Sequence, residues 1–498
     1  MFLYLLSAVF AFAIAGIITF INNYSKLYKL PPGPVGNWLP IFGYLPFMGK
    51  SPHLKYCELG KKYGDAFTIK FGAYPIVVLN KSSLIRECFK QDVYCGRPNY
   101  LLAMKVSKDG LTFATGPEAT EQRRFVLKTL RDLGFGRRSM EKLILDEVQE
   151  LVHYFKNSNT QTHHLEYLFG LSVINALWSI LATRKFSITD PYAIQVYKCA
   201  IEGFIDPPVS GALWFLPIVA KLFPKASGYS SVVEAVKKLR SLVSEVVEEH
   251  KIEYRKTGIV KDFVDAYIQK IESVQEEGLT NSSFYGERGY NNLVHVLIDL
   301  FTAGSDTLNS SLNFALKYLC ENRNILVEVQ KEIDNVVGNR EVRLVNLDDK
   351  DSLPLLDSVI QETLRLSSIV SSGILHSTTH PVNLVTDTGS YMLDANTIVM
   401  PNLYWVNHNP EQWENPDSFF PHRFIGNDKK HDVIAFSTGK RVCIAEVMAQ
   451  TEFFLFLGGI LANFNIQGGK EQTQFGDIKP GLVLNVHGLI LTLTYKHN

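Results

Sequence analysis

The residue types best suited to chemistry lie in a ten-residue loop, residues 436–445, which reads FSTGKRVCIA. Cys443 stands just before an apolar helical pattern that begins near Val447, so we expect it at a helix N-terminus. The partial positive charge and free N–H groups there favour a thiolate, the form of cysteine that binds metal ions. Arg441 adds a cation suited to a carboxylate. Cys443 taken alone also fits an inert, buried small side chain, and this alternative stays open.

A second candidate lies in the apolar stretch Leu293 to Leu319, which predicts a central, buried helix. Gly304 interrupts it, and a glycine inside a helix costs ~1 kcal/mol relative to alanine. Ala303 and Thr307 share a helix face, so the missing side chain at Gly304 predicts room for a small ligand beside the Thr307 hydroxyl. The neighbouring Asp306 needs a partner if it is buried. A helix kink is the alternative interpretation of the same residues.

The third candidate is an acid and a base three residues apart, Glu362 and Arg365, on a helix that is otherwise apolar. Such a pair forms a salt bridge. An exposed pair would be worth under ~1 kcal/mol. On this apolar helix we expect a buried pair that binds a further residue, and Arg423 is the candidate partner.

The elements that must position these residues are mostly helical. Apolar residues recur with helical period in Glu141 to Phe155, Val232 to Arg255, Leu293 to Leu319, Ile325 to Val337, Leu355 to Leu366 and Val447 to Phe464. Strand-like alternation is confined to Ala66 to Phe71, Pro75 to Leu79, Val382 to Thr386, Tyr391 to Met400 and Gly481 to Tyr495. The pattern predicts a mainly α fold with small β-sheets, of the α+β class.

Composition narrows the class of protein. With 498 residues, 46% of them hydrophobic, the chain can bury a large core, and no linker-like stretch divides its interior. Fifty basic and fifty acidic residues cancel, which excludes the electrostatic signature of a nucleic-acid binder. Six scattered cysteines form neither a disulfide framework nor a zinc motif. The phosphate-loop, GxSxG and HExxH motifs are absent.

The N-terminus carries a membrane-span pattern. Residues 2–21 contain no charge, and a helix of this length spans ~30 Å of hydrocarbon. Lys26 and Lys29 follow the run and nothing basic precedes it, so we expect the body in the cytoplasm. A cleaved signal peptide is the alternative. Residues 30–34, LPPGP, predict either a stiff spacer or an ordinary linker.

Together and in this order, the three motifs resemble the cytochrome P450 superfamily of haem-thiolate monooxygenases. The anchor, the proline-rich stretch and Cys95-Gly96-Arg97-Pro98 are similar to the animal microsomal branch. The resemblance implies the cytochrome P450 fold, a single large domain behind an N-terminal transmembrane helix. Its implied parts are a membrane anchor over residues 1–24, a proline-rich hinge over 25–45 and a haem-binding catalytic domain over 46–498.

The resemblance also assigns roles to matching positions. Cys443 is implied as the ligand of the iron of haem b, with Phe436 shielding its sulfur. Further contacts to the haem are implied for Arg441, Arg123, His376 and Gly439. The implied oxygen groove consists of Ala303, Gly304, Asp306 and Thr307. Within it, Asp306 and Thr307 are implied to deliver protons. A structural ion-pair cluster is implied for Glu362, Arg365 and Arg423. On the central helix, Asp299 matches a buried acid that we interpret as structural.

Departures from the family pattern are few. Ala445 replaces the usual glycine after the cysteine, and Ala119 stands where a tryptophan commonly donates to the haem. Ser368 and Ser371 replace prolines that usually follow the Glu362 helix, which leaves the shape of the adjacent substrate wall open.

The resemblance implies a reaction that inserts one atom of O₂ into an apolar small molecule: a steroid, a fatty acid, a terpenoid or a foreign compound. The implied partners are an NADPH-cytochrome reductase, which binds the NADPH, and cytochrome b5 as a further electron donor, with no nucleic acid. The implied location is the endoplasmic reticulum membrane, with the catalytic domain facing the cytoplasm. A basic patch for an acidic reductase is predicted at Arg131, Arg137, Arg138 and Lys440, and a plain solvated face is the alternative.

Two other functions remain open. One is a haem-thiolate isomerase or dehydratase that rearranges a peroxide without reductase, and the intact Asp306-Thr307 pair argues against it. The other is a non-catalytic, membrane-anchored carrier of haem or lipid. Dependence of turnover on NADPH and reductase discriminates all three.

Overall fold

The computed structural model of the chain describes residues 29–98, 101, 109–158, 162–165, 168–201, 215–338, 340, 342–426, 429–468 and 476–496. The anchor expected over residues 1–24 lies outside these ranges. Within them, no helix is both long enough and apolar enough to cross a membrane.

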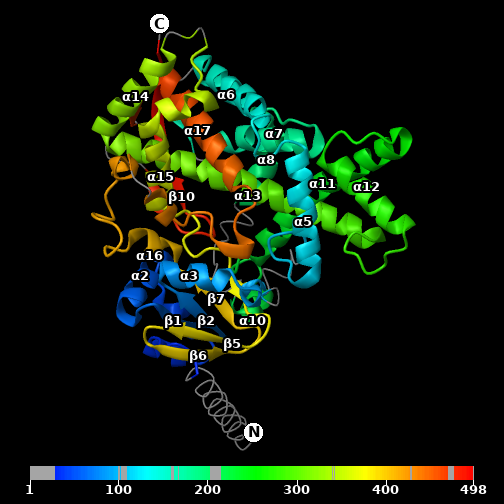
Figure 1. Cartoon of the computed structure of the whole chain (residues 1–498), viewed down its shortest axis with the longest axis vertical. Helices are drawn as coiled ribbons and strands as arrows, with labels where there is room; N and C mark the ends of the chain where they lie inside the picture. The colour runs from blue at the N-terminus through cyan, green and yellow to red at the C-terminus, as the bar shows by residue number, and fades with distance from the viewer. Residues whose placement is uncertain are drawn as a thin grey trace, which may run out of the picture.

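Helices make up most of the described chain (Figure 1), as the apolar periodicity predicts. They are α2 Pro52–Tyr63, α3 Ser82–Phe89, α5 Gly116–Asp132, α6 Met140–Lys156, α7 Leu168–Ala182, α8 Pro191–Ala200, α10 Pro217–Leu222, α11 Tyr229–Thr257, α12 Phe263–Glu276, α13 Gly286–Glu321, α14 Arg323–Val337, α15 Pro354–Ser367, α16 Leu403–His408 and α17 Glu446–Asn463. The six helices expected from the sequence correspond to α6, α11, α13, α14, α15 and α17. The longest, α13, has 36 residues and runs through the middle of the molecule.

The strands form four small sheets. They are β1 Ala66–Phe71, β2 Tyr74–Leu79, β3 Thr162–His164, β4 His376–Ser377, β5 Val382–Thr386, β6 Gly389–Leu393, β7 Ile398–Pro401, β8 Phe464–Gly468, β9 Asp477–Lys479, β10 Asn485–His487 and β11 Ile490–Tyr495. The largest sheet has the order β1-β2-β7-β4, with β7 parallel to β2 and the other pairs antiparallel. Three smaller sheets join β5 with β6, β9 with β10, and β11 with both β3 and β8.

Two predicted strands are each divided in the structure. The expected strand Tyr391 to Met400 breaks at Asn396, whose φ of 64° turns the chain, so β6 pairs with β5 while β7 joins β2. The expected strand Gly481 to Tyr495 breaks at Gly488, whose φ is 72°, between β10 and β11. A positive φ ends the regular extension of a strand, so in each case one half pairs with a nearby strand and the other half, β7 or β11, pairs with a strand from a distant part of the chain.

The described part of the proline-rich hinge lies against β1. The N–H of Thr68 donates to the Pro32 carbonyl at 2.9 Å, and the Asn37 amide donates to the Thr68 carbonyl at 2.7 Å. A Cβ on Gly33 would lie 1.9 Å from that same carbonyl oxygen, so only glycine allows this approach. These hydrogen bonds hold the described part of the hinge against the edge strand β1.

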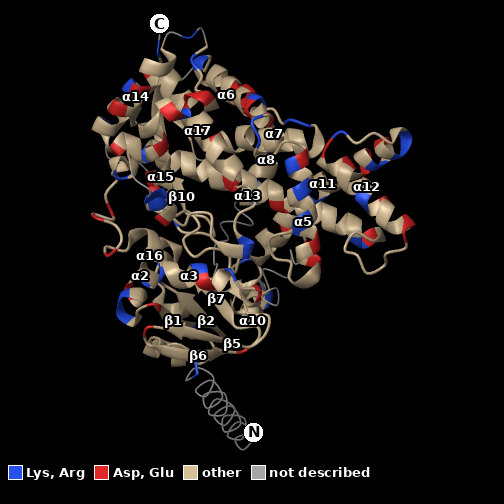
Figure 2. Ribbon diagram, viewed as in Figure 1, with Lys and Arg blue, Asp and Glu red and all other residues tan. Residues whose placement is uncertain are grey.

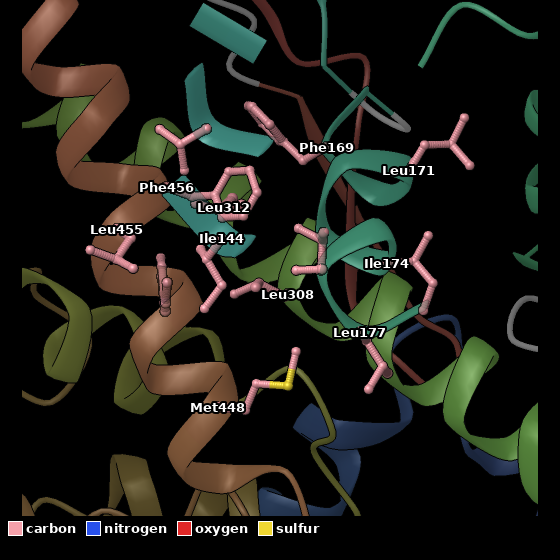
Figure 3. Close-up of a cluster of buried hydrophobic side chains, with 14 of the residues drawn as sticks. Ile144, Phe169, Leu171, Ile174, Leu177, Leu308, Leu312, Met448, Leu455 and Phe456 are labelled. Atoms are coloured by element: carbon pink, nitrogen blue, oxygen red, sulfur yellow. The ribbon is translucent and has the colours of Figure 1, made fainter. Parts of the chain in front are cut away.

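The main hydrophobic core surrounds α13. Figure 3 shows side chains of α6, α7 and α17 converging on Leu308 and Leu312 of α13, and nearly every described residue of α7 is buried. Acidic and basic side chains alternate over the outer helices, including α11, α12 and α14 (Figure 2). The apolar centre and mixed-charge surface agree with the zero net charge of the sequence.

Candidate active site

A cavity of about 320 Å³ lies between α13 and the loop that precedes α17. Its wall also includes residues of α5, α7, the chain after α15, and residues 482–483. Eight of the residues expected from the sequence line it: Arg123, Ala303, Gly304, Thr307, His376, Phe436, Arg441 and Cys443. Chain segments that are far apart in the sequence therefore supply one site.

Cys443 lies at the cavity wall with its side chain open to the cavity. Its N–H donates to the Phe436 carbonyl at 3.0 Å, which closes the loop, and α17 begins three residues later at Glu446. Burial raises the pKa of the Cys443 thiol, although the nearby N–H of Ala445 lowers it. The helix start expected to favour the thiolate thus does not outweigh burial, and a coordinating cation would complete the deprotonation.

Gly439 positions this loop through its backbone. Its φ is 75°, and a Cβ there would lie 2.0 Å from the Phe89 carbonyl oxygen at the end of α3. Gly439 is not among the residues that line the cavity. The structure therefore gives this residue a close approach between two segments, whereas the sequence placed it among the haem contacts.

Three arginines meet at one side of the cavity. Arg97 donates to the carbonyls of Thr112, Ile374 and Leu375 at 2.9 to 3.1 Å. Among the described residues, the hydrogen bonds of Arg123 and Arg441 also end on backbone carbonyls: that of Arg123 on Val442, and those of Arg441 on Leu111 and Ala114.

Among the described residues, none of these three guanidiniums forms an ion pair with a carboxylate. Burial, with the neighbouring Arg441 and Arg123, lowers the pKa of Arg97 well below its ordinary value. Burial and Arg123 likewise lower the pKa of Arg441 to about 10. The Nε of Arg441 is buried and has no hydrogen-bond partner in the described chain. The cluster suits a bound group with carboxylates, as in the two propionates of haem.

His376 completes this side of the cavity. Its ring stacks on Phe89 at a centroid distance of 3.8 Å, and its Nδ1 lies 2.7 Å from the Tyr94 carbonyl oxygen. Because a carbonyl only accepts, Nδ1 carries a proton. Burial, together with the Arg97 charge, lowers the pKa of His376 well below its ordinary value. An anion in the cavity would favour the doubly protonated ring.

The middle of α13 forms the opposite wall. Ala303 and Thr307 face the cavity, and the Thr307 hydroxyl donates to the Ala303 carbonyl at 2.8 Å. Gly304 also lines the cavity, but a Cβ there would lie 3.0 Å from Leu177. The missing side chain therefore serves close packing against α7 as well as the space expected from the sequence.

Asp306 lies apart from the other predicted groove residues. It is buried and does not line the cavity, and the amide of Asn485 in β10 donates to its Oδ2 at 3.5 Å. Asp299, one of the cavity-lining residues, accepts the N–H groups of Leu111 and Thr112 at 2.7 and 2.9 Å. Burial raises the pKa of Asp299 to about 6 despite these bonds.

The structure brings Glu362, Arg365 and Arg423 together below the site. The two Glu362 oxygens accept from Arg365 at 2.8 and 2.9 Å, and Arg423 lies 3.1 Å away. Arg365 also donates to the Asn407 carbonyl at 2.7 Å. The Asn407 side chain then binds both the N–H and the carbonyl of Ile434, two residues before Phe436. The ion cluster is thereby connected to the cysteine loop.

Two charged residues of the cavity wall were missed in the sequence. Arg97 stands in the Cys95-Gly96-Arg97-Pro98 motif, where an arginine between glycine and proline was the available signal. Glu452 lines the cavity from α17, and its signal was an acid inside a strongly apolar helix.

Comparison with known proteins gives consistent matches. The family model described as Cytochrome P450 matches residues 31–493. The chain is 32% identical to Cytochrome P450 18a1 of Drosophila melanogaster over 456 residues, covering 90% of this chain and 83% of the relative. It is 32% identical to Cytochrome P450 2B9 of Mus musculus, with 90% of each covered, and 30% identical to Farnesoate epoxidase of Bombyx mori, with 89% of each covered.

The ion cluster yields a stability prediction. Glu362→Ala leaves Arg365 and Arg423 buried without a counter-charge, so we expect the free energy of unfolding to fall by about 3–5 kcal/mol. Glu58 is a matched control, because it also pairs with a base three residues away, Lys55, but is 68% exposed. Glu58→Ala should cost under ~1 kcal/mol in the same denaturant titration. Equal losses for the two variants would contradict the structural role of the cluster.

Proposed function

Because the chain belongs to the cytochrome P450 family and is a haem-thiolate monooxygenase, we propose that it transfers one oxygen atom from O₂ to an apolar small molecule, with electrons that NADPH supplies through a flavoprotein reductase. The observation that carries this proposal is the joint presence of Cys443, Thr307 and the arginine cluster around one cavity.

The residues present fit haem b. Cys443 would be its thiolate ligand, while Arg97, Arg123, Arg441 and His376 would hold its propionates. Phe436 would shield the sulfur. Haem bound through a thiolate supplies the activation of O₂, because the sulfur donates electron density that promotes O–O cleavage.

The chain itself supplies a dry site and protons. The Thr307 hydroxyl donates to the Ala303 carbonyl, so its lone pairs are available to accept a hydrogen bond from a water in the cavity. We propose that Thr307 delivers protons there, with Asp306 as the acid behind it. Apolar side chains exclude bulk water from the rest of the wall, including Leu111, Phe113, Val173, Leu300, Ile369, Val370, Leu482 and Val483.

That apolar wall also supports the substrate class. Steroids, fatty acids, terpenoids and foreign compounds all bury apolar surface in such a pocket. One relative is named Farnesoate epoxidase, and farnesoate is an isoprenoid carboxylate. This similarity supports terpenoids and fatty acids among the proposed substrate classes.

The proposed electron donors are an NADPH-cytochrome reductase and cytochrome b5. Their proposed docking face carries Arg131, Arg137, Arg138 and Lys440, all of which are exposed. Arg138 is paired with Asp348, and Lys440 lies 2.5 Å from Asp92. The attraction of an acidic partner would therefore depend mainly on Arg131 and Arg137.

For location we propose the endoplasmic reticulum membrane, with an anchor over residues 1–24, a hinge over 25–45 and a cytoplasmic catalytic domain over 46–498. A second attachment surface supports this proposal. On and just after α10, Ile218, Leu222 and Phe223 are 73%, 69% and 60% exposed, respectively. Phe215 joins this helix to the β1–β2 hairpin through its ring contact with Phe71 at 5.1 Å. Exposed apolar side chains of this kind bind the interfacial region of a bilayer.

The attachment proposal is tested with lipid vesicles. Deleting residues 2–24 should weaken flotation with vesicles without changing the haem spectrum, and adding Phe223→Glu should remove the residual binding. Ile252 on α11 is 68% exposed and provides the control substitution, Ile252→Glu. Full binding after the deletion would reject the anchor, and equal effects of both glutamates would reject the α10 surface.

The ligand assignment is tested by Cys443→Ser. A hydroxyl is a much poorer ligand than a thiolate, so the reduced, carbon-monoxide-bound protein should lose its thiolate spectrum and turnover should collapse. Burial also raises the pKa of the Cys320 thiol, so Cys320→Ser is the control, and this variant should keep the thiolate spectrum and the turnover. A thiolate spectrum in the Cys443 variant would show that another residue holds the iron.

The proton role is tested by Thr307→Ala. Haem content and substrate binding should not change. The amount of product per NADPH should fall about a hundredfold while hydrogen peroxide rises, and an ordered water that replaces the hydroxyl would make this fall smaller. Ser305→Ala is the matched control, because Ser305 makes the same bond to a carbonyl four residues back (2.7 Å) but is buried away from the cavity. Unchanged coupling would reject the role, and turnover without NADPH or reductase would favour the isomerase.

A further inference from the structure

One buried base of the chain has neither a counter-charge nor a role in the proposed reaction. In the described chain the buried lysines and arginines are Lys70, Arg97, Arg365 and Arg423. Arg365 and Arg423 share the carboxylate of Glu362, and Arg97 belongs to the cluster that suits the haem propionates. Lys70, on β1, is therefore the buried base that the active site does not explain.

The ammonium group of Lys70 lacks a partner. Lys70 is only 3% exposed, and its backbone is satisfied, because its N–H donates to the Asn37 side chain at 2.9 Å and its carbonyl accepts the N–H of Tyr44 at 2.6 Å. Among the described residues, no group accepts a hydrogen bond from its Nζ or forms an ion pair with it. Burial lowers the pKa of Lys70, and no neighbouring carboxylate raises it. A buried ammonium without an anion is costly, so this position favours an anionic ligand.

A second polar side chain on the same face of β1 also lacks a partner. Thr68 precedes Lys70 by two residues, so both side chains point to one side of the sheet, about 7 Å apart along the strand. The Thr68 hydroxyl is buried and has no hydrogen-bond partner in the described chain. Across β2 the paired residues are apolar, Val77 for Thr68 and Pro75 for Lys70. The ammonium and the hydroxyl together offer donors to a group that has several acceptor oxygens.

Exposed apolar side chains lie on one side of this site. The Phe42 carbonyl accepts the N–H of Gly72, in the turn between β1 and β2, at 3.1 Å. The side chains of Val35, Ile41 and Phe42 are exposed. They therefore flank the turn that follows Lys70.

The α10 surface lies on the other side of the same turn. The ring of Phe215 lies 5.1 Å from that of Phe71, and a Cβ on Gly72 would lie 2.2 Å from the Phe215 carbonyl oxygen. Figure 1 shows α10 and the strands β1 and β2 at the same end of the molecule. Insertion of the exposed apolar side chains on both sides brings Lys70 to the interfacial region of a bilayer, where the lipid phosphates lie.

We propose that Lys70, with the Thr68 hydroxyl beside it, binds the phosphate group of an anionic phospholipid. A phosphate has several acceptor oxygens and a negative charge, which fit an ammonium and a hydroxyl on one strand face. The lipid supplies the counter-charge that the chain itself does not. This inference rests on the proposed membrane attachment and is independent of the proposed reaction.

The first experiment measures the binding of dioctanoyl phosphatidic acid to the haem-loaded full-length chain in detergent. Lys70→Met should weaken this binding about tenfold, because a charge-assisted hydrogen bond to the phosphate is lost. Lys70→Arg keeps the charge and should retain most of the affinity, whereas Thr68→Val should weaken binding about threefold. Lys237→Met, at an exposed lysine of α11, is the control and should bind as the parent does. Equal affinities of the parent and Lys70→Met would overturn the proposal.

The second experiment separates a lipid headgroup from free phosphate. The full-length chain is reconstituted in phosphatidylcholine vesicles, and labelling of its lysines by acetic anhydride is followed by mass spectrometry. Phosphatidic acid in the vesicles should protect Lys70 and leave Lys237 unchanged, and inorganic phosphate at the same concentration should protect neither. Full protection by inorganic phosphate would overturn the lipid assignment. Equal protection of both lysines would show a general charge effect and overturn the site.

Unfolding in denaturant checks the fold of the variant and the missing counter-charge together. Methionine keeps the apolar stem of the side chain and removes an unpaired ammonium, so without phosphatidic acid Lys70→Met should be at least as stable as the parent. Phosphatidic acid should raise the unfolding midpoint of the parent but not that of Lys70→Met. A less stable Lys70→Met in the absence of this lipid would mean that the ammonium already has a partner in the protein, which contradicts the proposal.

The outcomes separate this inference from the attachment on which it rests. If flotation with vesicles depends on residues 2–24 and Phe223 but Lys70→Met binds phosphatidic acid as the parent does, the phosphate site is wrong and the attachment stands. If phosphatidic acid binding depends on Lys70 while neither the deletion nor Phe223→Glu changes flotation, the proposed attachment surfaces are wrong and the phosphate site stands.

Discussion

The site depends on one buried carboxylate that two guanidiniums share. Glu362 holds Arg365 and Arg423 in an interior without compensating solvent, and such a cluster is stable only when every charge is paired and bonded. Arg365 extends the cluster to Asn407, whose side chain holds Ile434 at two points. Through these bonds the ion cluster fixes Ile434, and with it the start of the chain segment that leads to Cys443.

The arginine cluster differs from the ion cluster, because its three side chains all carry positive charge. Around the cavity, Arg97 is buried and Arg123 and Arg441 are partly buried, and their hydrogen bonds among the described residues end on neutral carbonyls. Burial lowers the pKa of all three guanidiniums, and repulsion by neighbouring arginines also lowers the pKa of Arg97 and of Arg441. The fold thus tolerates an unpaired positive region where the family binds a dianionic cofactor. Binding that cofactor relieves repulsion that the protein cannot relieve itself.

Helix geometry decides which groups can serve the cavity. Thr307 lines the cavity, whereas the side chain of the preceding Asp306 is turned away from it and bound by Asn485. The second wall, α17, presents mainly apolar side chains together with Glu452. The cavity therefore has hydroxyl groups of α13 on one wall and mainly apolar side chains of α17 on another.

The sequence by itself determined six of the longer helices, the cysteine loop and the Glu362–Arg365 pair, because periodicity and spacing of a few residues are local properties. It did not determine the split of Tyr391 to Met400 into two strands, because β7 takes its partner, β2, from about three hundred residues away. Only the tertiary structure placed Arg97 beside Arg441, turned Asp306 away and let burial raise the Cys443 pKa. These outcomes depend on which surfaces meet and how much water remains between them, and local sequence does not encode that directly.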